Sequence, residues 1–160
     1  MTVKTIMMTQ PKAVLPEDTV PKAVDLMLQH GIRNIPVVDG EGRFLGSFTT
    51  VHLIQLLLPM VATMESGFGD VTDLTFVHDT LADIRDRLQD VRSHKVGDYM
   101  ESRDIPFVDP DTSIMEAMLL LYKHRTHVPV VDRHSRRLVG VVSFNCVLRA
   151  ITGDEPCTGT

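Results

Sequence analysis

Pro36-Val37-Val38-Asp39 and Pro129-Val130-Val131-Asp132 are two copies of one tetrapeptide, and the sequence around them is repeated as well. Each copy follows a stretch with helical periodicity and precedes a stretch that contains a glycine, Gly46 or Gly140. The copies are offset by about 94 residues, which is longer than the roughly 20 to 50 residues of a solenoid unit. The chain is therefore predicted to fold as two similar subdomains packed as a pair.

The composition favours a packed domain and excludes several classes of protein. Hydrophobic residues make up 43% of the 160 residues, and the net charge is −5. A negative chain is a poor candidate for nucleic-acid binding, because such proteins carry a basic face that replaces phosphate counterions. The chain lacks the run of roughly 18 uncharged apolar residues that a membrane helix needs, and residues 1–12 lack a signal-peptide core. We expect a cytoplasmic protein with no membrane span.

The sequence contains no arrangement that predicts catalysis or a required cofactor. Two cysteines, Cys146 and Cys157, are too few for a disulfide framework. Ser143 has no predicted base beside it, and the glycines after Asp39 lack the Gly-Lys-Ser/Thr signature of a phosphate-binding loop. His124 and His127 flank the expected end of a helix, so they need not share a face as metal ligands. We predict neither an enzyme nor a metal site.

Each half has the residue pattern of a β-α-β-β-α subdomain. In the first half, strands are predicted at 13–15, 35–38 and 44–49, with helices over 20–30 and from about Val51. Thr19 is the expected N-cap of the first helix, and Gly31 is its expected stop. In the second half, strands are predicted at 107–108, 128–131 and 138–143, with helices over 114–124 and from Asn145. Ser113 and Glu116 form a predicted capping box.

A subdomain of this kind cannot bury both faces of its small sheet alone. The predicted fold class is therefore α+β, with two pseudo-symmetric subdomains at 1–58 and 96–152 packed through their small sheets. Residues 153–160 are predicted to be a disordered tail.

Residues 59–95 resemble neither half and are predicted to form a helical connector. Residues 59–64 are expected to end or extend the preceding helix, and 65–73 to form a Gly- and Asp-rich loop. Residues 80–93 are amphipathic, with Asp83 and Arg87 as an expected ion pair. The apolar face of that stretch consists of Leu81, Ile84, Leu88 and Val91. A packed connector and a contact with a dimer mate or another partner are both open interpretations.

The order of apolar strand, capped helix, histidine, Pro-Val-Val-Asp, hairpin and Gly-x-x-Thr/Ser resembles the cystathionine-β-synthase (CBS) domain. Here the domain is present twice, as the tandem pair called a Bateman module. Residues 3–9 and 96–100 resemble the lead-in that precedes each domain in that family. The resemblance implies a regulatory homodimer that binds an adenosine-type ligand in clefts between its domains. AMP, ADP, ATP and S-adenosylmethionine are the ligands that the family suggests, and a regulated protein partner is left open.

The resemblance also implies which residues lie at the ligand. Positions near the base correspond to Thr9, Ile35 and Pro36 in one half and to Ser102, Val128 and Pro129 in the other. The family's Gly-x-x-Thr/Ser-x-x-Asp motif supplies a hydroxyl toward phosphate, here Thr49 and Ser143. Its aspartate, which accepts from the ribose hydroxyls, is replaced by His52 and Cys146.

These replacements leave two functions open. A carboxylate accepts from both ribose hydroxyls, whereas a neutral histidine offers one acceptor and a cysteine only a weak one. Losing a charge-assisted pair costs about 1.5 to 3 kcal/mol, or roughly ten- to a hundredfold in affinity. The chain is thus predicted to be a ligand-sensing module or, alternatively, a structural or protein-interaction module that has lost nucleotide binding.

Two basic residues precede the Pro-Val strands at positions from which some family members reach a phosphate. Arg33 can contact a phosphate with two nitrogen atoms, and its alternative role is a salt bridge or a solvated charge at a helix end. His127 adds a charge only when it is protonated, and its alternative role is that of an ordinary histidine.

Overall fold

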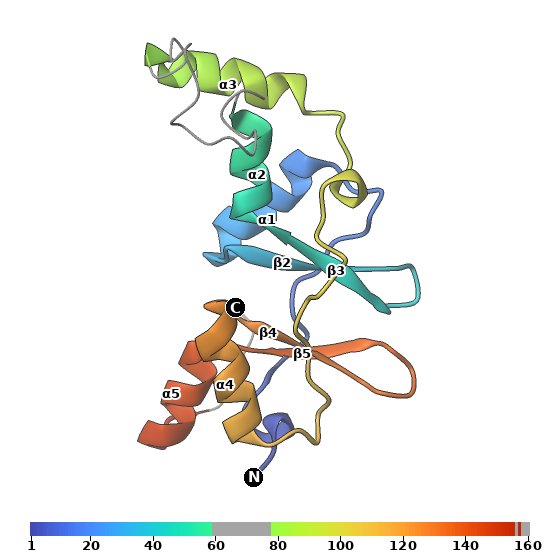
Figure 1. The fold of residues 1–160 in the computed structure, drawn as a ribbon, viewed down its shortest axis with the longest axis vertical. Coiled ribbons are helices and arrows are strands. Elements are labelled where there is room, and N and C mark those ends of the chain that lie inside the picture. The colour runs from blue at the N-terminus through green and yellow to red at the C-terminus, as the bar shows by residue number, and fades with distance from the viewer. Residues whose placement is uncertain (59–77, 156, 158–160) are drawn as a thin grey trace.

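The computed structural model describes residues 1–58, 78–155 and 157. Two similar halves are stacked along the long axis of the molecule (Figure 1). The first half consists of α1 (Val20–His30), β2 (Asn34–Val38), β3 (Phe44–Thr49) and α2 (Thr50–Leu57). The second half consists of α4 (Ile114–His124), β4 (Val128–Val131), β5 (Leu138–Val142) and α5 (Phe144–Thr152). The remaining elements are the 3-10 turns η1 (Val3–Thr5) and η5 (Val96–Asp98), the short strand β1 (Met8–Thr9) and the helix α3 (Leu81–Asp90). The α+β class and the α-β-β-α order of each half are confirmed. The strands predicted at 13–15 and 107–108 are wrong, because each is reduced to one isolated bridge, of Val14 with Val37 and of Val108 with Val130, and β1 was not predicted.

The first helices of the two halves begin and end at equivalent positions but by different means. The Ser113 hydroxyl accepts a hydrogen bond from the Glu116 amide at 3.2 Å, as an N-cap residue does. Thr19 holds the N-cap position of α1 without a side-chain cap bond, and the amide of Val20 donates to the carbonyl of His94 at 2.9 Å. At the other end, α1 stops at a left-handed Gly31 as predicted.

The segment before each half completes the sheet of the other half. Strand β1 pairs antiparallel with β5, which lies between β1 and β4. In the same way Glu101, which follows η5, pairs with Ser47 of β3 through backbone hydrogen bonds of 2.9 and 2.8 Å. Figure 1 shows the chain starting beside α4 and α5 and then crossing to the half that holds α1 and α2. The two lead-ins are therefore exchanged between the halves.

The two hydrophobic cores are exchanged in the same manner. Val3 and Ile6 are buried with residues of the second half such as Val128. Val96 is buried with residues of the first half such as Ile35. Val3 and Val96 are both fully buried, and burying a valine stabilises a fold by about 1.5 to 3 kcal/mol. Each lead-in therefore stabilises the half to which it is not adjacent in sequence.

Glycine at two positions lets the lead-ins approach the sheets. A Cβ atom at Gly46 would lie 2.2 Å from the carbonyl oxygen of Glu101, and one at Gly140 would lie 2.9 Å from that of Met8. The obstructing atoms at Gly46 are backbone, whereas at Gly140 the side-chain sulfur of Met7 lies at 2.7 Å, nearer than the Met8 carbonyl. A Cβ atom at either position would force the lead-in to move. The glycine of the repeated motif is thus required by the exchange of lead-ins.

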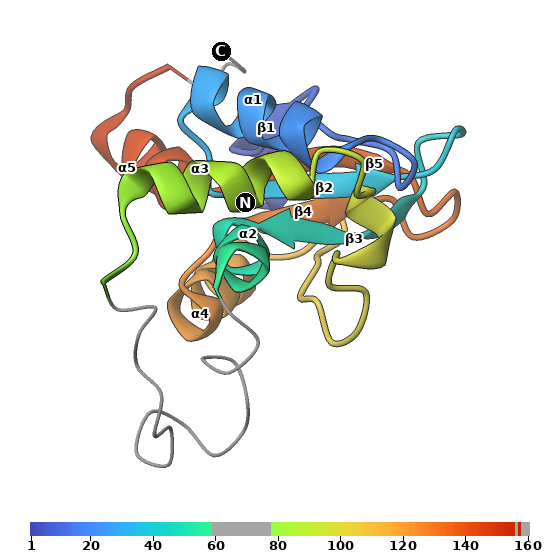
Figure 2. The ribbon, with the colours of Figure 1, turned by 90° about the horizontal axis from the view of Figure 1, so that it is seen from above.

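Helix α3 forms the outermost layer at one end of the molecule, beside α2 (Figure 2). Val91, which follows it, is buried, and Ile84 and Leu88 are half-buried, but Leu81 is exposed. Among the described residues the predicted partners Asp83 and Arg87 form no close ion pair, although Arg87 adds to the lowering of the Asp83 pKa that the Thr80 hydrogen bonds cause. Asp83 instead accepts hydrogen bonds from the backbone and hydroxyl of Thr80, both at 2.7 Å, and Arg87 forms an ion pair with Asp79. The expectations for residues 59–64 and 65–73 lie outside the described residues.

We predict that Gly46→Ala lowers the free energy of unfolding by about 1 to 3 kcal/mol, because the second lead-in must shift away from β3. Gly40→Ala is the matched control, since nothing lies within 4 Å of a Cβ atom at that position. Its expected effect is below about 0.5 kcal/mol. Urea unfolding measures both, and equal stability of the two variants would contradict the role assigned to Gly46.

Candidate functional site

The start of α2 brings together Thr49, His52 and Glu101, which with Arg33 we name the α2 site. Thr49 is the N-cap residue, and Nδ1 of His52 accepts the Thr49 amide at 3.1 Å. The histidine thus closes a capping box in place of a carboxylate. Its other ring nitrogen, Nε2, lies 3.8 Å from a carboxylate oxygen of Glu101. His52, which occupies the position expected to bind ribose, therefore caps the start of α2.

Arg33 supplies a positive charge to the α2 site. Its backbone carbonyl accepts the amide of Thr50, the first residue of α2, at 3.0 Å. The side chain is exposed and forms no ion pair within residues 1–58 and 78–155. Arg33 thus adjoins the start of α2, where its positive charge adds to the positive end of the helix dipole, a combination that favours anions.

The start of α5 carries the equivalent residues of the second half, Ser143 and Cys146, and with Thr9 we name it the α5 site. The Ser143 hydroxyl accepts the Cys146 amide at 3.3 Å and also lies 3.3 Å from the cysteine sulfur. Cys146 is buried, and Cys157 packs against the same core, although the tail was expected to be disordered. Burial and the neighbouring Cys146 raise the pKa of the Cys157 thiol to about 11. The thiol of Cys157 thus stays protonated at neutral pH.

The remaining expected residues divide between buried strand positions and exposed lead-in positions. The buried residues are Ile35, Pro36, Val128 and Pro129. Thr9 lies opposite Gly140 of the second half, whereas Ser102 follows the residue that pairs with the first half. The sequence grouped Thr9 with the strand of the first half and Ser102 with that of the second. The structure reverses this grouping, because the lead-ins are exchanged.

His127 joins the two halves. Its Nε2 atom lies 2.8 Å from the carbonyl oxygen of Asn34, to which a neutral ring donates, and the side-chain amide of Asn34 donates to the Thr126 hydroxyl at 3.1 Å. Burial lowers the pKa of His127, and the nearby charge of Arg33 lowers it further, against the raising effect of the Asn34 carbonyl. The neutral, hydrogen-bonded ring of His127 therefore adds no positive charge beside Arg33.

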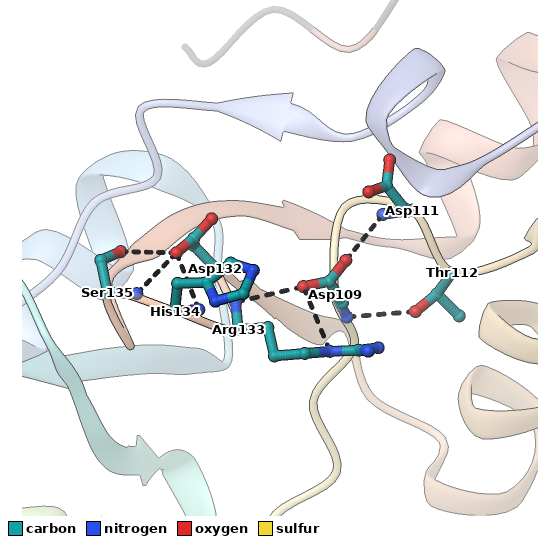
Figure 3. A network of polar contacts seen from close by, with 7 residues as sticks. All are labelled: Asp109, Asp111, Thr112, Asp132, Arg133, His134 and Ser135. Carbon is teal, nitrogen blue, oxygen red and sulfur yellow. Dashed lines mark hydrogen bonds and ion pairs between the residues drawn. The ribbon is translucent and has the colours of Figure 1, made fainter.

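Two surface hollows lie away from both sites. One, of about 520 Å³, is lined by the tips of the two hairpins, including Arg43 and Arg137. The other, of about 410 Å³, adjoins the polar network drawn in Figure 3. In that network the carboxylates of Asp109 and Asp132 accept hydrogen bonds from nearby backbone amides, such as that of Ser135 at 2.7 Å. Its side chains are thus used to form turns, and neither hollow contains an expected ligand-binding residue.

Among residues 1–58, 78–155 and 157, no three His, Cys, Asp or Glu side chains are grouped so that they could hold a metal ion. None of the helices in this part of the chain is both long and apolar enough to cross a membrane.

Sequence reasoning missed Ser47 and Glu101. Ser47 follows the motif glycine, and Glu101 follows the second lead-in. Aligning the lead-ins would have matched Glu101 with Met8. Only the pairing across the halves shows that Glu101 reaches the α2 site.

We predict that His127→Gln reduces the loss of stability on acidification. The folded-state pKa of His127 is below the ordinary 6.5, so the unfolded chain takes up its proton first and folding loses stability as the pH falls through this range. A glutamine amide can still donate to the Asn34 carbonyl but does not titrate. The fall in melting temperature between pH 7.5 and pH 5.5 should be smaller in this variant than in wild type and in the exposed-site control His124→Gln. Equal falls in all three would contradict this role.

The CBS domain family matches residues 3–59 and 96–153. The CBS domain-containing protein CBSX1, chloroplastic, of Arabidopsis thaliana is 30% identical over 141 residues, which are 86% of this chain and 57% of that protein. The inosine-5'-monophosphate dehydrogenase of Methanocaldococcus jannaschii is 26% identical over 137 residues, which are 85% of this chain and 21% of the enzyme. A protein of Methanopyrus kandleri matches over 30% of its own length. The chain thus spans from 21% to 57% of the length of these relatives.

Solved structures share the fold over nearly the whole chain. The CBS-pair protein CBSX2 from Arabidopsis thaliana has a TM-score of 0.74 at 22% identity, covering 95% of this chain and 94% of that one. CBSX2 in complex with AMP has a TM-score of 0.69 at 21% identity, covering 95% and 96%. The CBS domain pair of protein MJ0100, in complex with 5-methylthioadenosine and S-adenosyl-L-methionine, has a TM-score of 0.64 at 20% identity, covering 94% and 99%. With both repeats matched by the family and the fold shared, this chain belongs to the CBS domain family and contains a tandem pair of CBS domains.

Proposed function

We propose that the chain is a regulatory module that senses an adenosine-type ligand carrying a phosphate. The observation that carries this proposal is the position of Arg33, which is exposed and whose backbone carbonyl accepts the first amide of α2, next to the N-cap residue Thr49. A helix start with an arginine beside it suits a phosphate group. Two proteins of the same fold support the ligand class, since CBSX2 is in complex with AMP and the MJ0100 pair with S-adenosyl-L-methionine.

The ligand would act by shifting the placement of the two halves. A ligand shifts an equilibrium only through different affinities for its two states. The halves are joined by the His127 contact and by hydrogen bonds between the hairpins, from Phe44 to the Arg136 carbonyl and from Leu138 to the Gly42 carbonyl. Arg33 lies beside His127, so binding at the α2 site would act next to this join.

In this proposal the chain binds its ligand without converting it and requires no cofactor. The relative that is an enzyme shares 21% of its length with this chain, so its activity is not carried over. A regulated protein partner and a cytoplasmic location remain predictions from the sequence.

The alternative is a structural or protein-interaction module without nucleotide binding. His52 and Cys146 in place of aspartate favour it, as does the use of Ser143 in a helix cap. One measurement distinguishes the two functions, because only the ligand-sensing module is expected to bind an adenosine compound when it is folded.

We predict micromolar binding of AMP in a calorimetric titration. Arg33→Ala should weaken AMP binding by about tenfold or more, because a hydrogen-bonded ion pair is lost. It should change adenosine binding by less than about threefold, because adenosine lacks the phosphate. Equal losses for both ligands would contradict the role of Arg33, and no binding of AMP, ADP, ATP or S-adenosylmethionine by folded wild type would favour the alternative.

We further propose that the chain forms a homodimer through one face of α4 and α5, which pack on each other. The exposed apolar residues of this face recur at helical spacing on both helices. They are Met115, Leu119 and Tyr122 on α4 and Phe144, Leu148 and Ile151 on α5. Exposed apolar residues that recur along neighbouring helices are typical of an interaction site, and a second copy offers the same apolar residues.

We predict that Leu119→Lys combined with Leu148→Lys converts the dimer into a monomer, because two charges per chain would be buried at the interface. Leu45→Lys changes an exposed leucine of β3 and should leave the dimer intact. Sedimentation equilibrium distinguishes the states. A wild-type monomer, or a double variant that stays dimeric, would rule out this interface.

A further inference from the structure

The starts of α2 and α5 occupy equivalent backbone positions, but the side chains around them differ in polarity. Ser47 pairs with Glu101 in the first half, and Val141 pairs with Met8 in the second. These two cross-strand pairs occupy corresponding positions of the repeat, as do His52 and Cys146. Three polar side chains around α2 therefore correspond to two apolar side chains and a thiol around α5.

The polar side chains at the α2 site leave hydrogen-bonding capacity unused. Ser47 is 2% exposed, and its hydroxyl oxygen has no hydrogen-bond partner among the described residues. Directly paired residues of neighbouring strands project their side chains from the same face of a sheet, so Ser47 and Glu101 share a face. A buried hydroxyl without a hydrogen-bond partner costs free energy of folding. The unpaired Ser47 hydroxyl therefore favours the binding of a polar ligand group at this place.

His52 and Glu101 divide the roles of donor and acceptor. Because Nδ1 of His52 accepts the Thr49 amide, a neutral ring carries its hydrogen on Nε2, which faces the Glu101 carboxylate. His52 thus cannot accept from a ribose hydroxyl. The Glu101 side chain is 55% exposed, so its carboxylate has free lone pairs for two hydroxyl donors.

The α5 site lacks these groups. Cys146 is 3% exposed and lies in the second core, against which Met8 and Cys157 also pack. The Ser143 hydroxyl is engaged by the Cys146 amide and sulfur, as the Thr49 hydroxyl is engaged by His52, so the cap hydroxyls do not distinguish the two sites. Within the described residues, this site offers no carboxylate in place of the missing aspartate.

We infer that the chain binds the ribose of its ligand at the α2 site alone, and that Glu101, carried there by the exchanged lead-in, supplies the carboxylate that position 52 lacks. This inference rests on the proposed binding of an adenosine-type ligand. It adds that the two halves are not equal, so that one half senses the ligand while the other serves as a packed support.

The test is calorimetry with AMP and with 2′,3′-dideoxy-AMP on wild type and on Glu101→Gln. Wild type should bind one AMP per chain and prefer AMP over the dideoxy compound by about tenfold or more. Glu101→Gln should lower AMP affinity by a similar factor and leave the dideoxy affinity within about threefold. Both ligands carry the same phosphate, so any general effect of the lost charge affects them equally. Glu116→Gln removes the same charge from exposed α4 and should behave as wild type.

Three outcomes would overturn the inference. Wild type that binds AMP while Glu101→Gln keeps the full preference for AMP excludes Glu101 as the ribose acceptor. Two AMP sites of equal affinity per chain, measured on wild type alone, would exclude a single site. Wild type that binds neither nucleotide removes the proposed function and the inference with it, which separates that failure from the first two.

Discussion

The structure depends on one kind of contact, which occurs twice. In each case a lead-in crosses to the opposite half and pairs with its sheet, next to a glycine that leaves room for the lead-in backbone. The main-chain bonds between Ser47 and Glu101 and the pairing of Met8 with Val141 complete the sheets. The buried valines that the lead-ins carry complete the cores. Because each half is finished by residues from outside its own repeat, neither repeat contains all the parts of its packing unit. The same crossing brings Glu101 to the start of α2, so the candidate site is built by both repeats.

The segment that carries Glu101 connects the site to the rest of the first half. The His94 carbonyl in this segment bonds the first amide of α1, Val91 is buried below α3, and Val96 lies in the first core. A ligand that bound Glu101 would therefore contact a segment that is fixed at several points. Arg33 lies beside His127, at the join between the halves, so in the proposed function the phosphate end of the ligand would lie there. Both ends of an AMP-like ligand would thus contact elements shared by the two halves, as a sensor of their relative placement needs.

The sequence predicted the secondary structure closely because its local signals are strong. Helix α1 between Thr19 and Gly31, and strands β2 and β3 around the Asp39 turn, follow from capping residues and apolar alternation. The exchange of lead-ins could not be predicted, since pairing partners distant in sequence leave no periodic signal in one chain. Glu101 was missed for that reason, and His52 was identified as a departure from the family without its role as a cap. The Asp83–Arg87 pair failed because helical spacing permits a pair but does not exclude the competing partners Thr80 and Asp79.

Repetition of a motif does not preserve its chemistry. The hydroxyls Thr49 and Ser143 recur at both helix starts, but the surrounding polar groups recur at only one. Position for position, the second half has Val141, Met8 and Cys146 where the first half has Ser47, Glu101 and His52, while the backbone pairing is equivalent. A crystal structure of the chain with AMP tests this account most directly. The account predicts AMP at the start of α2, with its ribose against Glu101 and no nucleotide beside Ser143, and AMP bound beside Ser143 and Cys146 would contradict it.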